Sequence, residues 1–278
     1  MNKKIGIIGN GFVGNSIAFG FSPTHEIRIH DKDPKKNLNT LEEVLECDFI
    51  FVAVPTPMNK DGSISLKVVE KALQEISEKN TKNNIIILKS TMVPGSTNNF
   101  IKQFSKLNIV FNPEFLTERT AKLDFLTQAR IILGGDKKLT KQVAKMFEYR
   151  FMHTYIIETD TITAELIKYM NNVFFASKIS IMNEFKGVCD KVGANWDIAL
   201  KGFAADQRIG DSHLNVPGPD GKDGFGGACF PKDINAFMSM ADNLGVDIPT
   251  IKGVWKTNLK VRPERDWEKL EGRAIVKK

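Results

Sequence analysis

The residues most able to do chemistry in this 278-residue sequence surround Cys229. The segment GFGGACFPKD, residues 224–233, places three glycines before the cysteine and a proline, a lysine and an aspartate after it. Because Pro231 is a favoured first residue of a helix, we expect Cys229 at or just before a helix N-cap. The positive end of the helix dipole and the charge of Lys232 both favour the nucleophilic thiolate. We therefore predict a reactive thiol. The alternative, a small buried residue, accounts for Cys229 but not for its neighbours.

A second group is the glycine loop GNGFVG at residues 9–14. It follows a short apolar run and opens an amphipathic segment. In that context Gly9 permits a tight turn, Gly11 lets the backbone approach a pyrophosphate, and Gly14 allows close packing. The N-terminus of the following helix offers N–H groups to the phosphates. We predict dinucleotide binding in preference to a tight turn in an unrelated α/β domain.

Asp31 gives this loop its cofactor preference. It ends the next expected strand, where a carboxylate accepts hydrogen bonds from an adenosine ribose and repels a 2′-phosphate. The sequence therefore predicts NAD rather than NADP, although Lys35 and Lys36 nearby weaken that preference.

A third group lies on an expected long helix. Glu165, Lys168 and Asn172 are spaced i, i+3 and i+7, so they share one face. Lys168 and Asn172 could stabilise an alkoxide or oxyanion. A solvent-facing polar stripe is the competing interpretation.

Runs of apolar residues predict the sheet that positions these groups, buried on both faces. One helix is expected to open at Thr40, with a capping box to Glu43, and another to run from Leu66 to Ile76. The expected strands cover residues 4–8, 26–31, 49–54, 85–88, 108–111, 130–134 and 153–157.

The alternation of strands and helices stops near residue 160. A long helix is expected to begin there, with apolar side chains pointing nearly all round it. We predict an α/β fold with an N-terminal Rossmann-type, doubly wound parallel sheet over residues 1–158. An all-helical central or dimerisation domain over 159–260 follows, joined by the long helix and carrying the reactive cysteine. A basic tail covers 261–278, as a linker remnant or a dimer-packing extension.

Composition excludes several classes of protein. With 42% hydrophobic and 26% charged residues the chain is neither disordered nor fibrous. The net charge of +6 lies almost wholly in residues 251–278, which leaves no basic face for nucleic acid. No apolar run approaches the ~20 residues of a membrane span, and the four histidines lack metal-ligand spacing. Three cysteines, with Cys47 and Cys189 read as small buried residues, argue against disulfides and for the cytoplasm.

Seven motifs follow one another along the chain: GNGFVG at 9–14, VPTP at 54–57, KSTMVPGST at 89–97, NPEFLTE at 112–118, ELIKYMNN at 165–172, QRIG at 207–210 and GFGGACFPKD at 224–233. With these motifs the sequence resembles the UDP-glucose/GDP-mannose dehydrogenase family over nearly its whole length. The cysteine segment, in this order with the other motifs, is the most specific feature of the resemblance.

The resemblance implies NAD-dependent oxidation of a nucleotide sugar's primary alcohol to a carboxylate. UDP-glucose to UDP-glucuronate, for surface polysaccharide, is the first expectation. Cys229 would capture the intermediate aldehyde as a thiohemiacetal that becomes a thioester. Lys168 and Asn172 match the family's oxyanion-stabilising pair. Arg208 matches an arginine that reaches the sugar from a neighbouring subunit, which implies a homodimer.

The resemblance also implies further site residues. Proton transfer and hydrolysis would fall to Asp233 with Thr91, or to Glu114 and Glu118. The NAD contacts would come from Gly9, Gly11, Phe12, Val13, Gly14, Asp31, Lys36, Val54, Pro55, Thr56, Ser90, Thr91, Glu118 and Lys232. The substrate contacts would come from Glu114, Phe115, Leu116, Lys168, Asn172, Arg208, Phe225 and Gly226.

Three questions stay open at this stage. Family members usually carry a third domain that helps hold the nucleotide, and the stretch 215–222 is only a conjectured substitute. UDP-glucose, GDP-mannose and UDP-N-acetylmannosamine are all admissible substrates. A two-electron β-hydroxyacid dehydrogenase would share the dinucleotide domain and the lysine–asparagine pair but give Cys229 no role, and a non-catalytic NAD-binding paralogue would not bind the sugar.

Overall fold

The chain forms two compact units in a computed structural model that describes residues 3–277. The first unit comprises residues 1–56 and 66–168, and the second comprises 57–65 and 169–278. The chain therefore enters the second unit twice.

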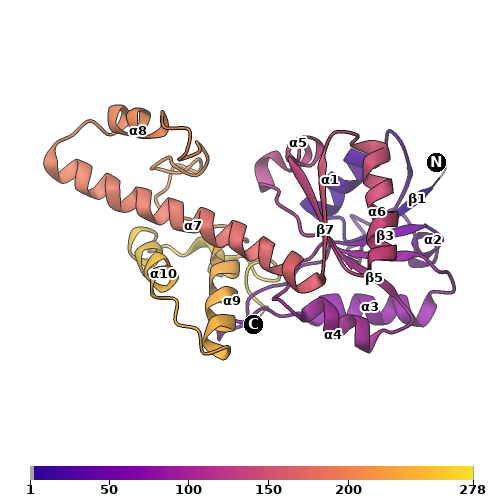
Figure 1. Ribbon diagram of the computed structural model, residues 1–278. Coiled ribbons are helices and arrows are strands. Elements are labelled where there is room, and N and C mark those ends of the chain that lie inside the picture. The colour runs from indigo at the N-terminus through magenta and orange to yellow at the C-terminus, as the bar shows by residue number, and fades with distance from the viewer. Residues whose placement is uncertain (1–2, 278) are drawn as a thin grey trace. The chain divides into compact units, whose positions relative to one another are not determined.

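The first unit, drawn in Figure 1, is built on a sheet. The sheet has seven strands in the order β2-β1-β3-β4-β5-β6-β7. Neighbouring strands run parallel except β5 and β6, which are antiparallel. The predicted α/β class is confirmed, with one antiparallel step in the sheet. The strands are β1 (Lys4–Ile8), β2 (Glu26–His30), β3 (Phe49–Val52), β4 (Ile85–Leu88), β5 (Asn108–Phe111), β6 (Arg130–Gly134) and β7 (Tyr155–Thr159).

The last strand begins two residues later than its apolar pattern predicts. A turn closed by the Thr154 N–H and the Phe151 carbonyl occupies the expected first positions. The other strand positions follow the sequence closely, because the buried apolar runs have no helical alternative of similar length.

Helices cover both faces of the sheet. One apolar core packs α1, α5 and α6 against one face, and a second packs α2, α3 and α4 against the other. The predicted capping box is present, since Thr40 and Glu43 exchange hydrogen bonds at the start of α2. The helices are α1 (Phe12–Phe21), α2 (Leu41–Leu45), α3 (Lys67–Lys79), α4 (Ser96–Gln103), α5 (Ala121–Leu126) and α6 (Lys137–Arg150), with a short 3₁₀ helix η1 (Glu118–Thr120).

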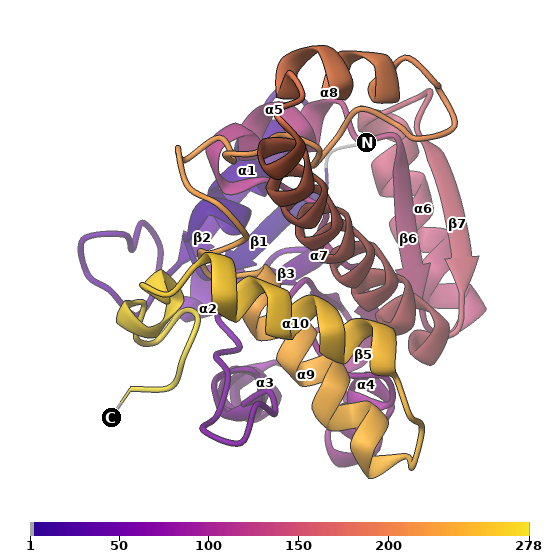
Figure 2. The same cartoon turned by 90° about the vertical axis from the view of Figure 1, so that its left-hand side faces the viewer.

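The second unit is helical and organised along a long helix, as the sequence predicts (Figure 2). This helix, α7, has 32 residues and changes unit after Lys168. Within the second unit, Ala176 of α7 packs with α9 and α10, and Met182 packs with α8 and the following loop. The elements are α7 (Thr161–Val192), α8 (Trp196–Ala204), α9 (Phe230–Asn243), α10 (Pro249–Val261) and η2 (Asp266–Lys269).

Many apolar side chains of α7 stay exposed. Phe174, Phe185 and Val192 are 63%, 49% and 71% exposed. None of the helices within residues 3–277 is long and apolar enough to cross a membrane.

The segment after α10 is packed into the second unit. Trp267 and Ala274 are buried, and Met58 exchanges backbone hydrogen bonds with Ala274 and Val276. What composition marks as a basic tail is therefore part of the folded unit.

Glu165 has a structural role that its helix spacing conceals. Its carboxylate accepts hydrogen bonds from the Gly95 N–H at 2.6 Å and from the N–H and hydroxyl of Thr97 at 2.7 Å. It therefore caps α4 from within the first unit, where the N-cap Gly95 has no side chain to do so.

We expect Glu165→Ala to lower the free energy of unfolding by about 3 kcal/mol, because it leaves several buried donors without an acceptor. Chemical denaturation measures this loss. The matched control, Glu148→Ala on the exposed face of α6, should change stability by less than about 0.5 kcal/mol. Equal effects of the two substitutions would contradict the capping role.

Candidate active site

The glycine loop has the geometry that a pyrophosphate requires. Gly9 adopts φ +99°, and a side chain there would meet the Ala53 carbonyl at 2.6 Å. A Cβ at Gly14 would lie 1.9 Å from the Gly9 oxygen, so α1 packs directly on the turn. At Gly11, by contrast, a Cβ would have no described atom within 4 Å. Gly11 is also the N-cap of α1 and offers no capping side chain, so the first-turn N–H groups are open to an anion.

Asp31 lies against this loop. Its carboxylate accepts hydrogen bonds from the Asn10 N–H at 2.6 Å and from the Asp33 N–H at 2.8 Å. Because a carboxylate has about four lone-pair sites, acceptor capacity remains for a ribose hydroxyl. The loop and Asp31 together fit a dinucleotide. The ammonium of Lys36 lies 3.8 Å from Asp33 rather than at Asp31.

A buried charged cluster follows the carboxyl ends of β4 and β5. Lys168 Nζ donates to the Glu114 carbonyl at 2.5 Å and to its carboxylate at 3.0 Å. Lys89 Nζ donates to Asn112 Oδ1 at 3.0 Å and to the Pro113 carbonyl at 3.2 Å. The two lysines therefore hydrogen-bond to three consecutive residues, 112–114.

The charges of this cluster follow from burial and pairing. Burial lowers the pKa of Lys89 to about 7, with Glu114 opposing that shift and Lys168 adding to it. A neutral amine has two N–H donors, which matches the two oxygens that Lys89 contacts. Burial raises the pKa of Glu114, but the charge of Lys168 and hydrogen bonds from Leu116 and Lys168 outweigh it, so the pKa lies below its usual value.

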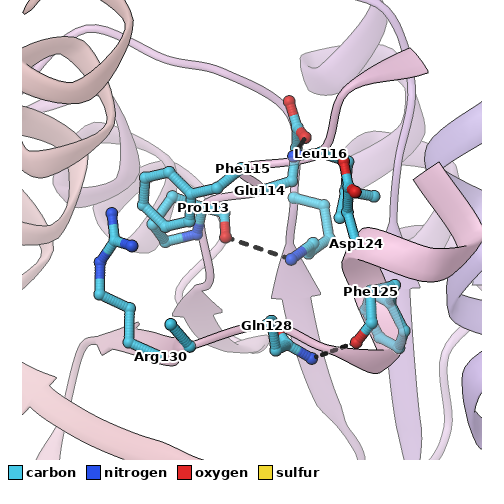
Figure 3. Close-up of a pocket in the computed structure, with 10 residues that line it drawn as sticks. Pro113, Glu114, Phe115, Leu116, Asp124, Phe125, Gln128 and Arg130 are labelled. Carbon is cyan, nitrogen blue, oxygen red and sulfur yellow. Dashed lines mark hydrogen bonds between the residues drawn. The ribbon is translucent and has the colours of Figure 1, made fainter. Parts of the chain in front are cut away.

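A cavity of about 120 Å³ opens beside the cluster (Figure 3). Its lining includes Lys89, Glu114 and the Phe115 ring, over which the Arg130 guanidinium sits 4.3 Å from the centroid. The cavity is therefore lined both by charged groups and by an aromatic face.

The second unit places Cys229 at the N-cap of α9, as the sequence predicts. In the first turn of that helix, the Asp233 N–H donates to the Cys229 carbonyl at 2.9 Å. The buried Asp233 carboxylate accepts from Asn172 Nδ2 at 2.5 Å and pairs with Lys232. Cys229 is partly buried and in no disulfide.

The other predicted site residues differ in burial and in their hydrogen-bond partners. Glu118 is exposed on η1, and the Arg208 side chain is 89% exposed and pairs with Asp206. Phe225 is buried, and its N–H donates a hydrogen bond to Asn258 Oδ1. Ser90 donates to the Val54 carbonyl at 2.6 Å. The remaining loop residues include exposed Pro55 and buried Thr56 and Thr91. No three histidine, cysteine or acidic side chains gather as a metal site within 3–277.

Sequence comparison assigns both units. Residues 35–151 match the NAD-binding domain of the UDP-glucose/GDP-mannose dehydrogenase family, and residues 162–260 match its central domain. The chain belongs to this family. Its N-terminal unit is accordingly an NAD-binding Rossmann-type domain.

Individual relatives agree with that assignment. The chain is 38% identical to the UDP-glucose 6-dehydrogenase of Rickettsia conorii, across 82% of this chain and 52% of the relative. It thus spans about half the length of such curated relatives. A UDP-glucose dehydrogenase structure from Pyrobaculum islandicum superposes with a TM-score of 0.84 at 26% identity, covering 98% of this chain and 71% of that one. A 3-hydroxyisobutyrate dehydrogenase from Mycobacterium tuberculosis shares the fold, with a TM-score of 0.74 at 18% identity and 95% of both chains covered.

Sequence reasoning did not single out Lys89 or Asn112. Both lie inside family-like motifs, at the ends of β4 and β5. The available signal was a lysine directly after an unbroken apolar strand, since the carboxyl ends of such strands surround the ligand crevice of doubly wound sheets.

Lys89 should make stability depend on pH. Its folded pKa of about 7 lies below its ordinary value of 10.5, so the unfolded chain binds the extra proton between these values. Stability therefore rises with pH across that window, by about 1.4 kcal/mol per pH unit. Below pH 7 the cost of charging the buried amine is fully present.

Denaturant titrations at pH 7–10 on wild type and Lys89→Met measure this effect. The wild type should gain stability relative to the variant as pH rises. Lys145→Met, on the exposed face of α6, serves as control and should follow the wild type. Parallel curves for wild type and Lys89→Met would mean that Lys89 does not titrate in this window.

Proposed function

We propose that this chain catalyses the NAD-dependent, four-electron oxidation of a nucleotide sugar, UDP-glucose to UDP-glucuronate. Cys229 at the N-cap of α9, with Asp233 and Asn172 bonded in the same unit, carries the proposal. Family membership supports it, and so does the similarity to the UDP-glucose 6-dehydrogenase of Rickettsia conorii.

The domain roles follow the same division. Residues 1–158 would hold NAD, 159–260 would form the central and dimerisation domain, and 261–278 would complete it. NAD⁺, when bound, takes up two electrons at a time, so the full oxidation consumes two equivalents. The proposed contacts are the glycine loop with Asp31 and Lys36, the residues after β3 and β4, Glu118 and Lys232.

The first oxidation turns the C6 alcohol into an aldehyde. Its hydroxyl proton must leave, and the alkoxide that develops needs donors. Lys168 and the Asn172 amide are the proposed donors, because both are buried and hydrogen-bonded in fixed positions. Phe115, Leu116, Phe225 and Gly226 are proposed to contact the sugar nucleotide.

Cys229 then forms a covalent adduct. Its thiolate adds to the aldehyde carbon, and the oxygen takes a proton to give a thiohemiacetal. That adduct loses a hydride from its carbon and a proton from its hydroxyl, two electrons and two protons in all, and becomes a thioester. Water adds to the thioester carbonyl, the carbon–sulfur bond breaks, and carboxylate and thiol are released. Capture on Cys229 keeps the aldehyde bound between the two oxidations.

A base must activate that water. Asp233 with Thr91, or Glu114 and Glu118, are the proposed groups. Glu114 is ionised at neutral pH, since Lys168 holds its pKa low against the effect of burial. The thiol chemistry requires a reducing compartment, in keeping with a cytoplasmic protein.

A homodimer is part of the proposal. The exposed apolar side chains of α7 offer a surface for a second copy. The Arg208 guanidinium is exposed and pairs with Asp206, so it is accessible to a neighbouring subunit. Arg208 would then contact the sugar bound by the neighbouring copy.

The two-electron β-hydroxyacid dehydrogenase is the second candidate, because the fold matches such an enzyme. Cys229 and its loop have no role in that chemistry. A non-catalytic paralogue is disfavoured by the filled positions at Cys229, Lys168, Asn172 and Asp233. Calorimetry with UDP-glucose and NAD⁺ tests it, since that reading requires the sugar not to bind.

Stoichiometry tests the proposed reaction. The wild type should form two NADH per UDP-glucose, measured by absorbance, and Cys229→Ala should abolish UDP-glucuronate formation because no thioester can form. Cys189→Ala, a change at a buried cysteine of α7, should retain turnover. One NADH per sugar with an active Cys229→Ala would exclude the thioester route. GDP-mannose, UDP-N-acetylmannosamine and hydroxy acids complete the substrate panel.

Subunit mixing tests the role of Arg208. Arg208→Ala and Cys229→Ala homodimers should each be inactive, because every site lacks one group. Dissociated and re-formed together, they should regain about a quarter of wild-type turnover, since half the dimers are mixed and each then has one intact site. No recovery, with mixed dimers detected by mass spectrometry, would place Arg208 in the site of its own subunit.

A further inference from the structure

We propose that Arg262 and Asp266, beyond α10, position the loop that carries Cys229 and thereby set the reactivity of its thiol. This rests on the proposed function only in giving Cys229 its task; the contacts are independent of it.

The loop before Cys229 has few backbone partners of its own. Residues 224–227 belong to no helix or strand, so their buried N–H groups need acceptors from side chains. Asn258 of α10 brackets Phe225, accepting from its N–H at 2.7 Å and donating to its carbonyl at 3.0 Å. The Gly227 N–H donates to Asp266 Oδ2 at 2.9 Å. Asp266 thus anchors Gly227, which lies two residues upstream of Cys229.

Arg262 fixes Asp266. The arginine is 3% exposed and donates to Asp266 Oδ1 and Asp220 Oδ2, both at 2.6 Å, and to the Asp223 carbonyl at 3.3 Å. A guanidinium buried to this degree requires such partners, and its planar fork holds them in fixed directions. Burial raises the pKa of Asp266, but hydrogen bonds from Arg262 and Gly227 outweigh it, so this carboxyl stays ionised at neutral pH.

The glycines match this anchor. A Cβ at Gly226 would lie 2.3 Å from Asp266 Oδ1 and 2.6 Å from Arg262 Cζ. The ion pair therefore occupies the place of a side chain at residue 226. Residue 226 must therefore be glycine because Arg262 and Asp266 fill the space that a side chain would need.

That segment is held firmly enough to act as a support. Trp267 is 2% exposed, and its ring centroid lies 5.4 Å from that of Trp255 on α10. A fixed Gly227, with only Ala228 between, leaves Cys229 little freedom to leave the N-cap of α9. At that N-cap the helix dipole favours the thiolate. Releasing the anchor should weaken that effect and expose the thiol.

Alkylation of Cys229 by iodoacetamide, followed by peptide mass spectrometry across pH 5–10, tests this. Because the thiolate is the reacting form, Asp266→Ala should react at least about threefold more slowly at pH 7 and as fast or faster at pH 10. The midpoint of its pH profile should move upward. A merely destabilised fold would speed alkylation at every pH. Asp242→Ala breaks an exposed ion pair with Lys252 in the same unit and should keep the wild-type profile.

A folded Asp266→Ala with the wild-type profile would overturn the proposal. If that variant does not fold, Asp266→Asn keeps the side-chain shape but replaces one acceptor oxygen by a donor, so the hydrogen bonds from Gly227 and Arg262 cannot both be kept. The midpoint is again expected to move upward, against the downward shift that loss of a nearby negative charge alone would cause. Amide exchange at Gly227 in the wild type is a further check, and exchange at the rate of an unstructured loop would also overturn it. Because alkylation needs neither NAD nor sugar, a shifted profile in a chain that forms no NADH would refute the proposed function alone.

Discussion

Charged side chains removed from water determine the arrangement of both units, because each must find a partner or destabilise the fold. In the first unit, Lys168 ends the portion of α7 that packs on the sheet and pairs with Glu114 after β5. In the second, Asp233 accepts from Asn172 and pairs with Lys232. Arg262, at the end of α10, joins the loop at residues 220–223 to Asp266. These pairs fix the backbone around the very groups to which we assign chemistry.

The fold was largely accessible from sequence. Local structure was predicted from unbroken apolar runs, from the glycine loop and from the capping box at Thr40. Strands β1 and β4 and the start of α2 lie where these patterns predict them. The antiparallel step between β5 and β6 was not accessible, since an apolar strand reads the same in either direction. The unit membership of residues 57–65 was not accessible either, because it depends on Met58 pairing with residues more than two hundred positions away.

The site was accessible in part. Residue types at a helix start and a strand end pointed to Cys229 and Asp31, and spacing along one helix face pointed to Lys168. Glu165 shows the limit: helix spacing placed it beside Lys168 as a candidate, yet its carboxylate caps α4. Arg262 shows the opposite error. Its composition-based assignment was to a basic tail, yet its side chain is buried and pairs with Asp220 and Asp266. The α4 partners of Glu165 and the Asp220 partner of Arg262 are distant in sequence, so spacing along the chain does not reveal them.

The double entry of the chain into the second unit limits how this protein can be recombined. A genetic crossover within α7 would exchange residues 169–278 as a block but leave 57–65 from the original parent. Met58 would then have to form its backbone hydrogen bonds with residues of the other parent in place of Ala274 and Val276. Viable chimeras should therefore inherit two separate gene segments together. We expect residues 57–65 and the C-terminal segment to change together, although residues 66–168 of the first unit are encoded between them.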